Sequence, residues 1–210
     1  MKKLIYLCLS VLIMHSCDND YYHDSGLAKG VHDCSLMEYM ENTGNNNWDS
    51  AVVAIRYTGL EDVFNGTDPQ YKEGITFFGF TNYSVFQFLE KTVDAEGNRL
   101  YHSIRDIPVD VCRKMVLCHV IRGKVVMQDV DYEIKGTLEG GTDCETLTGI
   151  TLRVYRIKMP SANGTPDTGA DKLAIHARVS GHMATVASCN IQTQNGIVHS
   201  LRSDYQWTEL

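Results

Sequence analysis

The sequence lacks the motifs that most often identify an enzyme or a metal protein. It contains no His-Glu-x-x-His, no Cys-x-x-Cys and no Gly-x-Ser-x-Gly, and its glycine-rich stretch lacks the Lys-Ser/Thr ending of a phosphate-binding loop. Carboxylate pairs such as Glu61-Asp62 occur, but glycosidase chemistry needs two carboxyls about 5 to 10 Å apart across a cleft. We therefore predict no catalytic residue, no metal site and no cofactor, and we do not expect an enzyme.

Basic residues are also scarce. Lys and Arg total 19 against 26 Asp and Glu, which gives the 210 residues a formal net charge of −7. Because nucleic-acid phosphates require a basic surface, we expect no nucleic acid among the partners. A local basic excess is interpreted as a solvated face, with a site for acidic glycans as the alternative; it consists of Arg105, Arg113, Lys114, Arg122 and Lys124.

Long apolar runs are missing as well, which argues against a multi-span membrane protein. An apolar stretch of eleven residues, Leu4 to Met14, follows Lys2 and Lys3. As a helix it would span roughly half of a bilayer core, so it fits the core of a secretory signal peptide better than a membrane anchor.

The residues after this stretch sharpen the prediction. Met14-His15-Ser16-Cys17 resembles a bacterial lipobox, in which the Cys is lipidated, the peptide is cut before it and the new amine is acylated. The resemblance implies a lipoprotein signal peptide over residues 1–16, lipidation at Cys17 and attachment to a membrane through the lipid anchor. Ordinary signal peptidase cleavage near Ser16 is the alternative.

Residues 17–33 read as the lipidated Cys followed by a flexible tether, because the stretch is acidic and has little to pack. An acidic stretch directly after such a Cys resembles the surface-export signal of lipoproteins from Gram-negative gut anaerobes. We therefore expect an outer-membrane location facing the cell exterior, with a periplasm-facing location as the alternative.

Hydrophobic periodicity predicts one domain over residues 34–210. Helices are expected at 36–40, 48–57, 81–90 and 108–117, and strands at 75–80, 117–121, 147–155, 173–177, 184–188 and 196–201. Residues 91–107 and 158–171 read as long connections. Helices come first and strands later, which favours an α+β fold over a doubly wound sheet.

The inward faces of two helices follow from the same periodicity. We expect Val85, Phe86 and Leu89 to face inward on the helix at 81–90. The predicted buried face of the helix at 108–117 consists of Val109, Cys112, Met115, Val116 and Cys118. Thr81 or Asn82 can cap the first of these helices, and Asp49 is predicted to cap the helix at 48–57.

Four segments occur in the order and spacing of a fasciclin domain. Ile75 to Phe86 resembles the first homology box, and Leu117 to Gly123 resembles the Tyr-His segment. Ala184 to Ser188 followed by Asn190-Ile191 resembles the strand before the second box, and Asn195 to Leu201 resembles the second box itself. The resemblance spans about residues 33 to 208.

The resemblance implies an α+β, fasciclin-like domain with helices packed on a small β-sandwich or wedge-shaped sheet. It assigns a structural role to the family-motif residues Thr81, Asn82, His119, Gly123, Asn195, Gly196 and His199. The chain departs from the family pattern at Gly79-Phe80, where Ala-Pro is usual, at Cys118 for Tyr and at Arg122 for Pro. Loss of that Tyr puts in question any adhesive role carried on the Tyr-His segment.

Several of these residues also have an interpretation without the family. Asn195-Gly196 suits a two-residue turn, because both tolerate positive φ. His119 and His199 are flanked by aliphatic residues, so we expect buried rings whose nitrogens bond to backbone carbonyls or to a Thr or Asn side chain. Cys118 and His119 are interpreted as neighbours on a strand, whose side chains point to opposite faces and cannot share a metal.

The number and spacing of the cysteines bear on whether the chain forms disulfides. The predicted mature chain keeps Cys34, Cys112, Cys118, Cys144 and Cys189 besides Cys17. Five thiols cannot all pair within one chain. If the helix at 108–117 continues through Cys118, Cys112 and Cys118 lie too far apart along it to bridge. We expect no essential disulfide.

The sequence thus favours a cell-envelope lipoprotein whose fasciclin-like domain mediates adhesion or contact with an extracellular protein or glycan. The alternative is a glycan- or small-ligand-binding accessory of an outer-membrane uptake system. The oligomeric state and the identity of the partner stay open.

Overall fold

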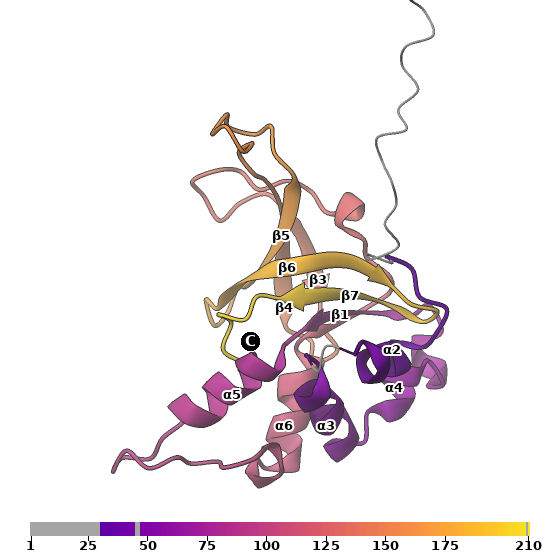
Figure 1. Cartoon of the computed structure of the whole chain (residues 1–210), viewed down its shortest axis with the longest axis vertical. Helices are drawn as coiled ribbons and strands as arrows, with labels where there is room; N and C mark the ends of the chain where they lie inside the picture. Colours follow the sequence, from indigo (N-terminus) through magenta and orange to yellow (C-terminus); the bar gives the residue numbers. More distant parts are fainter. Residues whose placement is uncertain (1–29, 45–46, 209) are drawn as a thin grey trace, which may run out of the picture.

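The computed structural model describes residues 30–44, 47–208 and 210 (Figure 1). The predicted signal peptide, Cys17 and all of the tether before residue 30 lie outside these residues. In the described part, five α-helices lie on one side of a strongly curled sheet of seven strands, and the hairpin of β4 and β5 projects away from the helices.

The helices are α2 (Leu36–Asn42), α3 (Asp49–Tyr57), α4 (Glu61–Asn65), α5 (Asn82–Lys91) and α6 (Val109–Leu117). Short 3-10 turns occupy Pro69–Tyr71, Ile104–Asp106 and Met127–Asp129. The four predicted helices are confirmed. The short α4 was not predicted; it ends at Gly66, whose φ of 74° suits a residue without a Cβ.

Two side chains predicted to face inward do not. Phe86 is 52% exposed and Val109 is 42% exposed. On α5 the buried Val85 and half-buried Leu89 are four residues apart and share one face. Phe86 lies one residue further round the helix, beyond the edge of that face. Val109 is the first residue of α6 and lies at its exposed end.

The strands are β1 (Ile75–Gly79), β2 (Val120–Arg122), β3 (Thr142–Glu145), β4 (Thr151–Lys158), β5 (Asp171–Ala177), β6 (Met183–Gln192) and β7 (Gly196–Leu201). Their order in the sheet is β2-β1-β7-β6-β5-β4-β3. Strand β1 runs parallel to β7, with Phe77 opposite Val198, and the other neighbours are antiparallel.

The two edges of the sheet meet. Ile121 of β2 forms a bridge with Thr146, directly after β3, and the N–H of Leu147 donates to the carbonyl of Val120 at 2.8 Å. The predicted α+β class is confirmed, and its sheet is one curled layer that nearly closes into a barrel.

Several strands differ from the sequence prediction, and β6 continues to Gln192, beyond the predicted end at residue 188. The strand expected from residue 117 starts at Val120, because α6 continues through Leu117. The strand expected from residue 147 starts at Thr151, because Thr146 to Gly149 form a turn closed by a 2.9 Å backbone hydrogen bond. Strand β3 was missed, since its polar Thr-Asp-Cys-Glu sequence has no apolar alternation.

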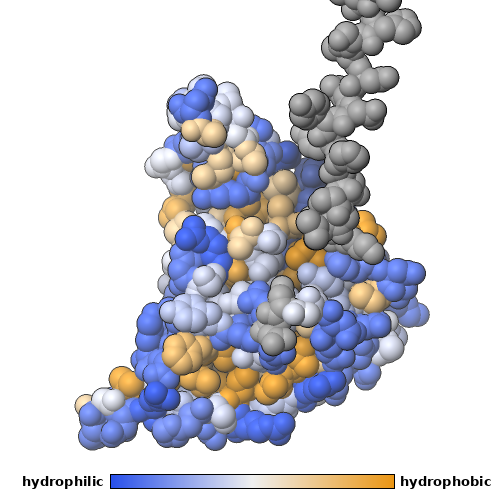
Figure 2. Space-filling model, in the orientation of Figure 1, coloured by the Kyte–Doolittle hydropathy of each residue, from blue (hydrophilic) through white to orange (hydrophobic). Residues whose placement is uncertain are grey.

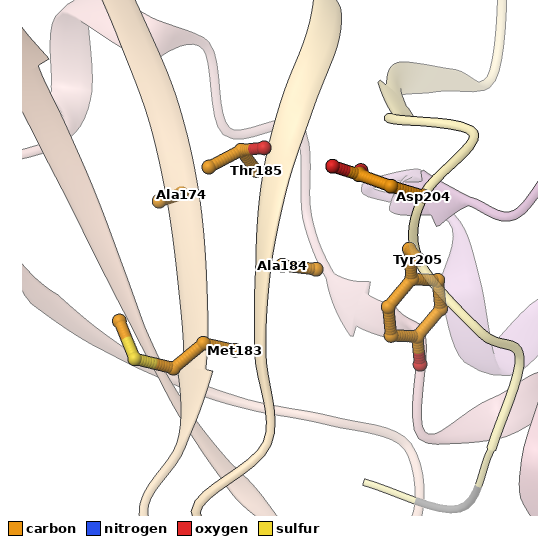
Figure 3. A pocket seen from close by; sticks show the side chains of 6 residues that line it. All are labelled: Ala174, Met183, Ala184, Thr185, Asp204 and Tyr205. Carbon is orange, nitrogen blue, oxygen red and sulfur yellow. The ribbon is translucent and has the colours of Figure 1, made fainter.

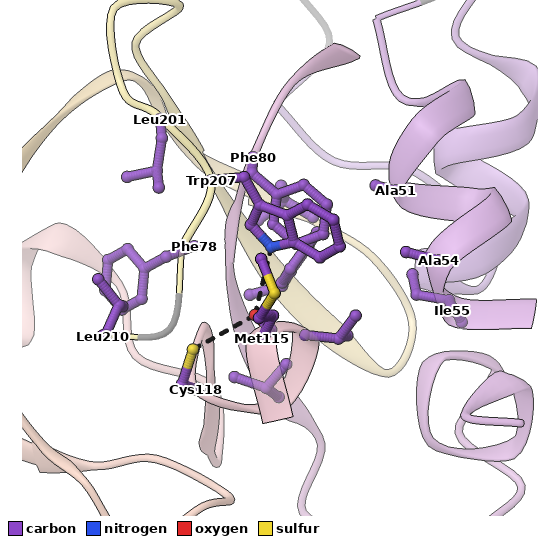
Figure 4. Close-up of a cluster of buried hydrophobic side chains, with 14 of the residues drawn as sticks. Ala51, Ala54, Ile55, Phe78, Phe80, Met115, Cys118, Leu201, Trp207 and Leu210 are labelled. Atoms are coloured by element: carbon purple, nitrogen blue, oxygen red, sulfur yellow. Dashed lines mark hydrogen bonds between the residues drawn. The ribbon is translucent and has the colours of Figure 1, made fainter. Parts of the chain in front are cut away.

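The end of the chain completes the core. We call residues 202–208 the C-terminal strap. Its Trp207 is fully buried and stacks on Phe80 with ring centroids 4.7 Å apart. The Nε1 of Trp207 donates to the carbonyl of Met115 at 3.3 Å, and Figure 4 shows this bond as a dashed line from the indole. The strap therefore joins the start of α5 to the end of α6.

Candidate functional site: the homology boxes and the groove beside them

The first homology box holds two helices by their N-termini. Thr81 Oγ1 accepts from the N–H of Ser84, and Ser84 Oγ accepts from the N–H of Thr81, both at 3.3 Å, so Thr81 caps α5. Asn82 acts on α3, because its Oδ1 accepts from the N–H of Ser50 at 2.8 Å. Its Nδ2 also donates to the carboxylate of Asp49 at 3.1 Å.

The predicted cap at Asp49 is therefore wrong. Asp49 is the first residue of α3, and the preceding Trp48 occupies the N-cap position without a side-chain hydrogen bond. The side chain that caps a helix belongs to the residue just before its first turn, so the side chain of the first helical residue does not serve as the cap. Asn82, 32 residues along the chain from Ser50, supplies the acceptor that α3 lacks locally.

The second homology box repeats this arrangement at α2. Asn195 Oδ1 accepts from the N–H of Leu36 at 2.8 Å, and its Nδ2 donates to the carbonyl of Phe64 at 2.9 Å. Its own carbonyl accepts from the N–H of Ile75 at 3.1 Å. One residue therefore joins the start of α2, the end of α4 and the start of β1.

The reason predicted for Asn195-Gly196 is wrong, because neither residue has a positive φ. The turn between β6 and β7 has three residues and closes through the N–H of Thr193 and the carbonyl of Gly196, 2.8 Å apart. Glycine is required at 196 for space: a Cβ there would lie 2.7 Å from Cδ1 of Leu36 and 2.8 Å from the carbonyl oxygen of Ile75.

His119 lies fully buried beneath the C-terminal strap. Its Nδ1 donates to the carbonyl of Met115 at 2.7 Å, and its Nε2 accepts from the hydroxyl of Tyr205 at 2.7 Å. Burial lowers the pKa of the imidazole to about 4, although the bond to Met115 acts in the opposite direction. A neutral ring with both nitrogens bonded connects α6 to the strap.

The interpretation of Cys118 and His119 as strand neighbours with opposed side chains is wrong. Cys118 ends α6 as its C-cap residue, and both side chains are fully buried. The Sγ of Cys118 lies 3.3 Å from Nδ1 of His119 and also 3.3 Å from the carbonyl of Met115. The two side chains thus share one polar cluster inside the core.

His199 and Gly123 hold the opposite side of the sheet. His199 Nε2 donates to the carbonyl of Val125 at 2.9 Å, and Nδ1 accepts from the N–H of Asn190 at 3.2 Å. Burial lowers the pKa of this imidazole to about 4 as well. Gly123 turns with φ 85°, and its carbonyl accepts from Oγ1 of Thr76 at 2.7 Å. These bonds fix the segment after β2 against β1 and β7.

The box residues thus use their polar side chains inside the domain, and a binding surface has to be sought beside them. A groove of about 360 Å³ runs between α3, α5 and the 3-10 turn at Ile104–Asp106. We call it the α3–α5 groove. Buried Val85 and Ile104 contribute to its lining, with Val53 and Phe86 as exposed apolar residues. Its polar lining residues are Ser50, Asn82, Ser103 and Arg105.

Figure 2 shows an apolar area on the surface between α5 and α3. Phe86 is 52% exposed, and its ring stacks on the exposed ring of Tyr83 with centroids 5.9 Å apart. The sequence indicated Phe86 as a core residue, so this surface was missed. The available indication was helical periodicity: Val85 and Leu89 are four residues apart and share one face, whereas Phe86 lies beside that face.

One solved structure with the same fold is a FAS1 domain pair from the insect cell adhesion molecule fasciclin I. It is 13% identical, with a TM-score of 0.51 over 79% of this chain and 46% of that chain. The chain has the fasciclin (FAS1) fold. It spans about half of the matched chain, which is a domain pair. No family model and no curated protein matches the sequence.

Each departure from the fasciclin pattern is accommodated locally in this fasciclin-like domain. Phe80 stacks on Trp207, and Cys118 fills core space beside Met115. Arg122 donates from Nη1 to the carbonyl of Gln70 at 2.7 Å, and its guanidinium lies 4.9 Å from the ring centroid of Tyr71. The substituted residues therefore make contacts specific to this chain.

In this fasciclin-like domain, several basic side chains donate hydrogen bonds to backbone carbonyls. Besides Arg122, Arg113 donates to the carbonyl of Thr58, and Lys124 donates to the carbonyl of Gln194 at 2.6 Å. These bonds hold neighbouring segments together. Three of the five basic residues that the sequence analysis grouped together therefore bond to backbone atoms of the protein itself.

The most strongly perturbed carboxylate belongs to Asp171 on β5. Hydrogen bonds, the largest effect coming from Lys158, followed by Arg156 and Tyr132, lower its pKa to about 2. Arg156 Nη2 lies 2.6 Å from Oδ2 of Asp171, and the Tyr132 hydroxyl donates to the same oxygen at 2.9 Å. The cluster fixes the 131–141 loop to the β4–β5 hairpin.

Within residues 30–44, 47–208 and 210, no group of three or more His, Cys, Asp or Glu is arranged to hold a metal ion. No disulfide joins any two of the five cysteines in this part of the chain. None of its helices has both the length and the apolar character needed to cross a bilayer.

Proposed function

We propose that the chain is a cell-envelope lipoprotein whose FAS1 domain mediates adhesion, or contact with an extracellular protein or glycan. The FAS1 fold is shared with the domain pair of an insect cell adhesion molecule, and this supports a contact role. The apolar stretch before Cys17 supports the lipid anchor. The partners are then a membrane through the lipid and an extracellular protein or glycan through the domain.

The observation that carries the contact role is the α3–α5 groove. Exposed apolar clusters with a polar rim are typical of interaction sites. Here Phe86 and Val53 offer apolar surface, and the Asn82 amide and the Arg105 side chain lie beside it. A partner that covers Phe86 removes a half-exposed aromatic ring from water, which is a favourable contribution to binding.

Two matched valines test the groove. Val53 in the groove is 38% exposed on α3, and Val111 outside its lining is 39% exposed on α6. We expect Val53→Asp to reduce attachment of chain-coated beads to matrix proteins or neighbouring cells by about tenfold, because it buries a charge at the contact. Val111→Asp should attach like the unmodified chain.

Thermal melts of both variants establish that the fold is intact. Equal attachment by the Val53→Asp and Val111→Asp variants would exclude the groove as the contact surface. Attachment that persists after deletion of residues 30–210 would exclude adhesion by this domain altogether.

The anchor has its own experiment. Cells that express the chain are labelled with radioactive palmitate, and we expect Cys17→Ala to abolish the label on the protein. Protease added to intact cells should remove the domain if it faces the exterior. Unchanged labelling of the Cys17→Ala variant would rule out the lipid anchor, and protection from protease would favour the periplasmic side.

A glycan- or small-ligand-binding accessory of an outer-membrane uptake system is the second candidate. The volume of the groove, about 360 Å³, lies near the lower end of ordinary ligand pockets, about 300–1,000 Å³. A ligand that binds the folded state raises its melting temperature. A thermal-shift screen of glycans and apolar ligands should then give a ligand that stabilises the unmodified chain and not Val53→Asp. A screen without any stabilising ligand would count against this role.

A further inference from the structure

Strand β6 extends beyond the end of its neighbour β7. Val186 pairs with Leu201, the last residue of β7, and the N–H of Arg202 donates to the carbonyl of Thr185 at 2.9 Å. After that bond the chain leaves the sheet and continues as the C-terminal strap. The first residues of β6, from Met183 onward, therefore have β5 on one side and no strand on the other.

The geometry of the β5–β6 hairpin shows which backbone groups face the open side. The N–H of Ala177 donates to the carbonyl of His182 at 2.8 Å. Bonded and non-bonded pairs alternate along antiparallel strands. The next bonded pair is therefore Ile175 with Ala184, and the N–H and C=O of Met183 and Thr185 point away from β5.

Three of these four backbone groups have no partner in the described part of the chain. The carbonyl of Thr185 accepts from Arg202, but the N–H of Thr185 and both backbone groups of Met183 make no hydrogen bond there. Met183 is 56% exposed, so these groups are accessible from solvent. Two N–H donors and one carbonyl acceptor on an extended segment form the template for an added strand.

A cleft lies between this edge and the C-terminal strap. One part, of about 260 Å³, lies between Ala184 on β6 and Tyr205 on the strap, and a second part of about 230 Å³ extends to Thr208. Figure 3 shows Ala184 directed toward the strap, with Asp204 and Tyr205 on the opposite side of the opening.

The charge of the residues that line the cleft indicates which kind of segment it could bind. The side chain of Asp204 contributes a carboxylate to the lining of both parts of the cleft, and none of the residues that line either part is Lys or Arg. One oxygen of Asp204 lies 3.1 Å from Nη2 of Arg202, and the side chain is 66% exposed. The whole chain carries a net charge of −7. A segment with a basic side chain is therefore electrostatically complementary to this opening.

We propose that the cleft binds an extended, lysine- or arginine-containing segment of a partner protein as an added strand beside Met183–Thr185. The peptide backbone pairs with the free groups of Met183 and Thr185 at the usual strand spacing of about 4.8 Å. Its basic side chain meets Asp204. This goes beyond the proposed contact role, because it uses a second surface and recognition through the backbone.

The test uses a phage library of random short linear peptides panned on the immobilised full-length chain. We expect enriched peptides to contain Lys or Arg next to aliphatic residues. A synthetic copy of an enriched peptide is then titrated by fluorescence polarisation. Met183→Pro removes the N–H that faces the cleft without removing a bond to β5, and Pro is tolerated at the first residue of a strand.

Met183→Leu is the matched control, because it keeps the N–H and a similar apolar side chain. We expect Met183→Pro to weaken peptide binding by about tenfold and Met183→Leu to bind like the unmodified chain. Asp204→Asn should weaken binding of the basic peptides and reduce their enrichment. Bound peptide should also slow amide hydrogen exchange at Met183 and Thr185.

Equal binding to the Met183→Pro and Met183→Leu variants would overturn the proposal, as would enrichment without basic residues. If Met183→Pro does not fold, hydrogen exchange decides: a peptide that binds without slowing exchange at Met183 and Thr185 overturns it. The peptide experiments and the attachment experiment on Val53 test different surfaces. Failure of the proposed peptide site would therefore leave the result for Val53 unchanged, and failure of the proposed contact role would leave the peptide titration interpretable.

Discussion

The indole ring of Trp48 occupies the space that a side chain at position 79 would need. A Cβ built on Gly79 would lie 2.6 Å from Cη2 of Trp48, which no real Cβ tolerates. Trp48 is 2% exposed at the start of α3, and its ring lies 6.4 Å from that of Phe77 on β1. The glycine that departs from the fasciclin pattern thus admits a large aromatic side chain between helix and sheet.

Gly79→Ala should therefore destabilise the domain through overpacking. We expect a loss of about 1–3 kcal/mol in the free energy of unfolding, measured by urea titration. In a Trp48→Leu background the same substitution should cost less, because the clashing ring is gone. An equal cost in both backgrounds would show that Trp48 is not the obstacle.

Asn195→Ala should be costly, because one side chain serves two helices. It removes the acceptor for the N–H of Leu36 and the donor to the carbonyl of Phe64. We expect a loss of about 2–3 kcal/mol in unfolding free energy from two hydrogen bonds and a cap. The neighbouring Gln194→Ala, whose side chain is exposed, should change stability by less than about 0.5 kcal/mol. Similar values for both would contradict the role assigned to Asn195.

The two buried histidines make the stability dependent on pH. Each folded-state pKa is about 4, below the ordinary 6.5. The unfolded chain therefore binds protons more readily, so stability is full above pH 6.5 and falls as the pH drops toward 4. Each histidine removes up to about 1.4 kcal/mol per pH unit in this window.

Urea titrations between about pH 5 and 7 measure this slope. His199→Gln should flatten it, while Gln at the exposed His182 should leave it unchanged. A slope that is the same in all three proteins would contradict the assignment. The window lies above the lowered pKa of Asp171, so that carboxylate stays ionised throughout.

Trp207→Ala should loosen the C-terminal strap. The substitution empties a fully buried site and removes the stack on Phe80, so we expect a loss of about 3–5 kcal/mol in unfolding free energy. Arg202→Ala on the same strap removes an exposed side chain that pairs with Asp204, and it should cost less than about 1 kcal/mol. Hydrogen exchange at α5 and α6 should rise in the Trp207→Ala variant and not in Arg202→Ala.

Local pattern was sufficient for the main elements. The helices at α3 and α5 follow from apolar spacing, and Thr81 marks the start of α5 because a hydroxyl at that position caps the first turn. Strand β7 follows from its apolar residues after a turn. Polar β3 and short α4 could not be found this way, because their stability comes from pairing and packing with distant segments.

The sequence by itself determined the α+β class, the order of the segments that resemble a fasciclin domain, and the buried character expected of His119 and His199. Only the tertiary structure decided that Asn82 and Asn195 cap helices far from them in sequence, that Gly196 is needed for space and not for positive φ, and that Phe86 is exposed. The physical reason is the sequence distance over which each effect acts, because helix periodicity and capping depend on residues within one or two turns of each other. Close approach, long-range hydrogen bonds and the open edge of β6 exist only after strands and helices have packed.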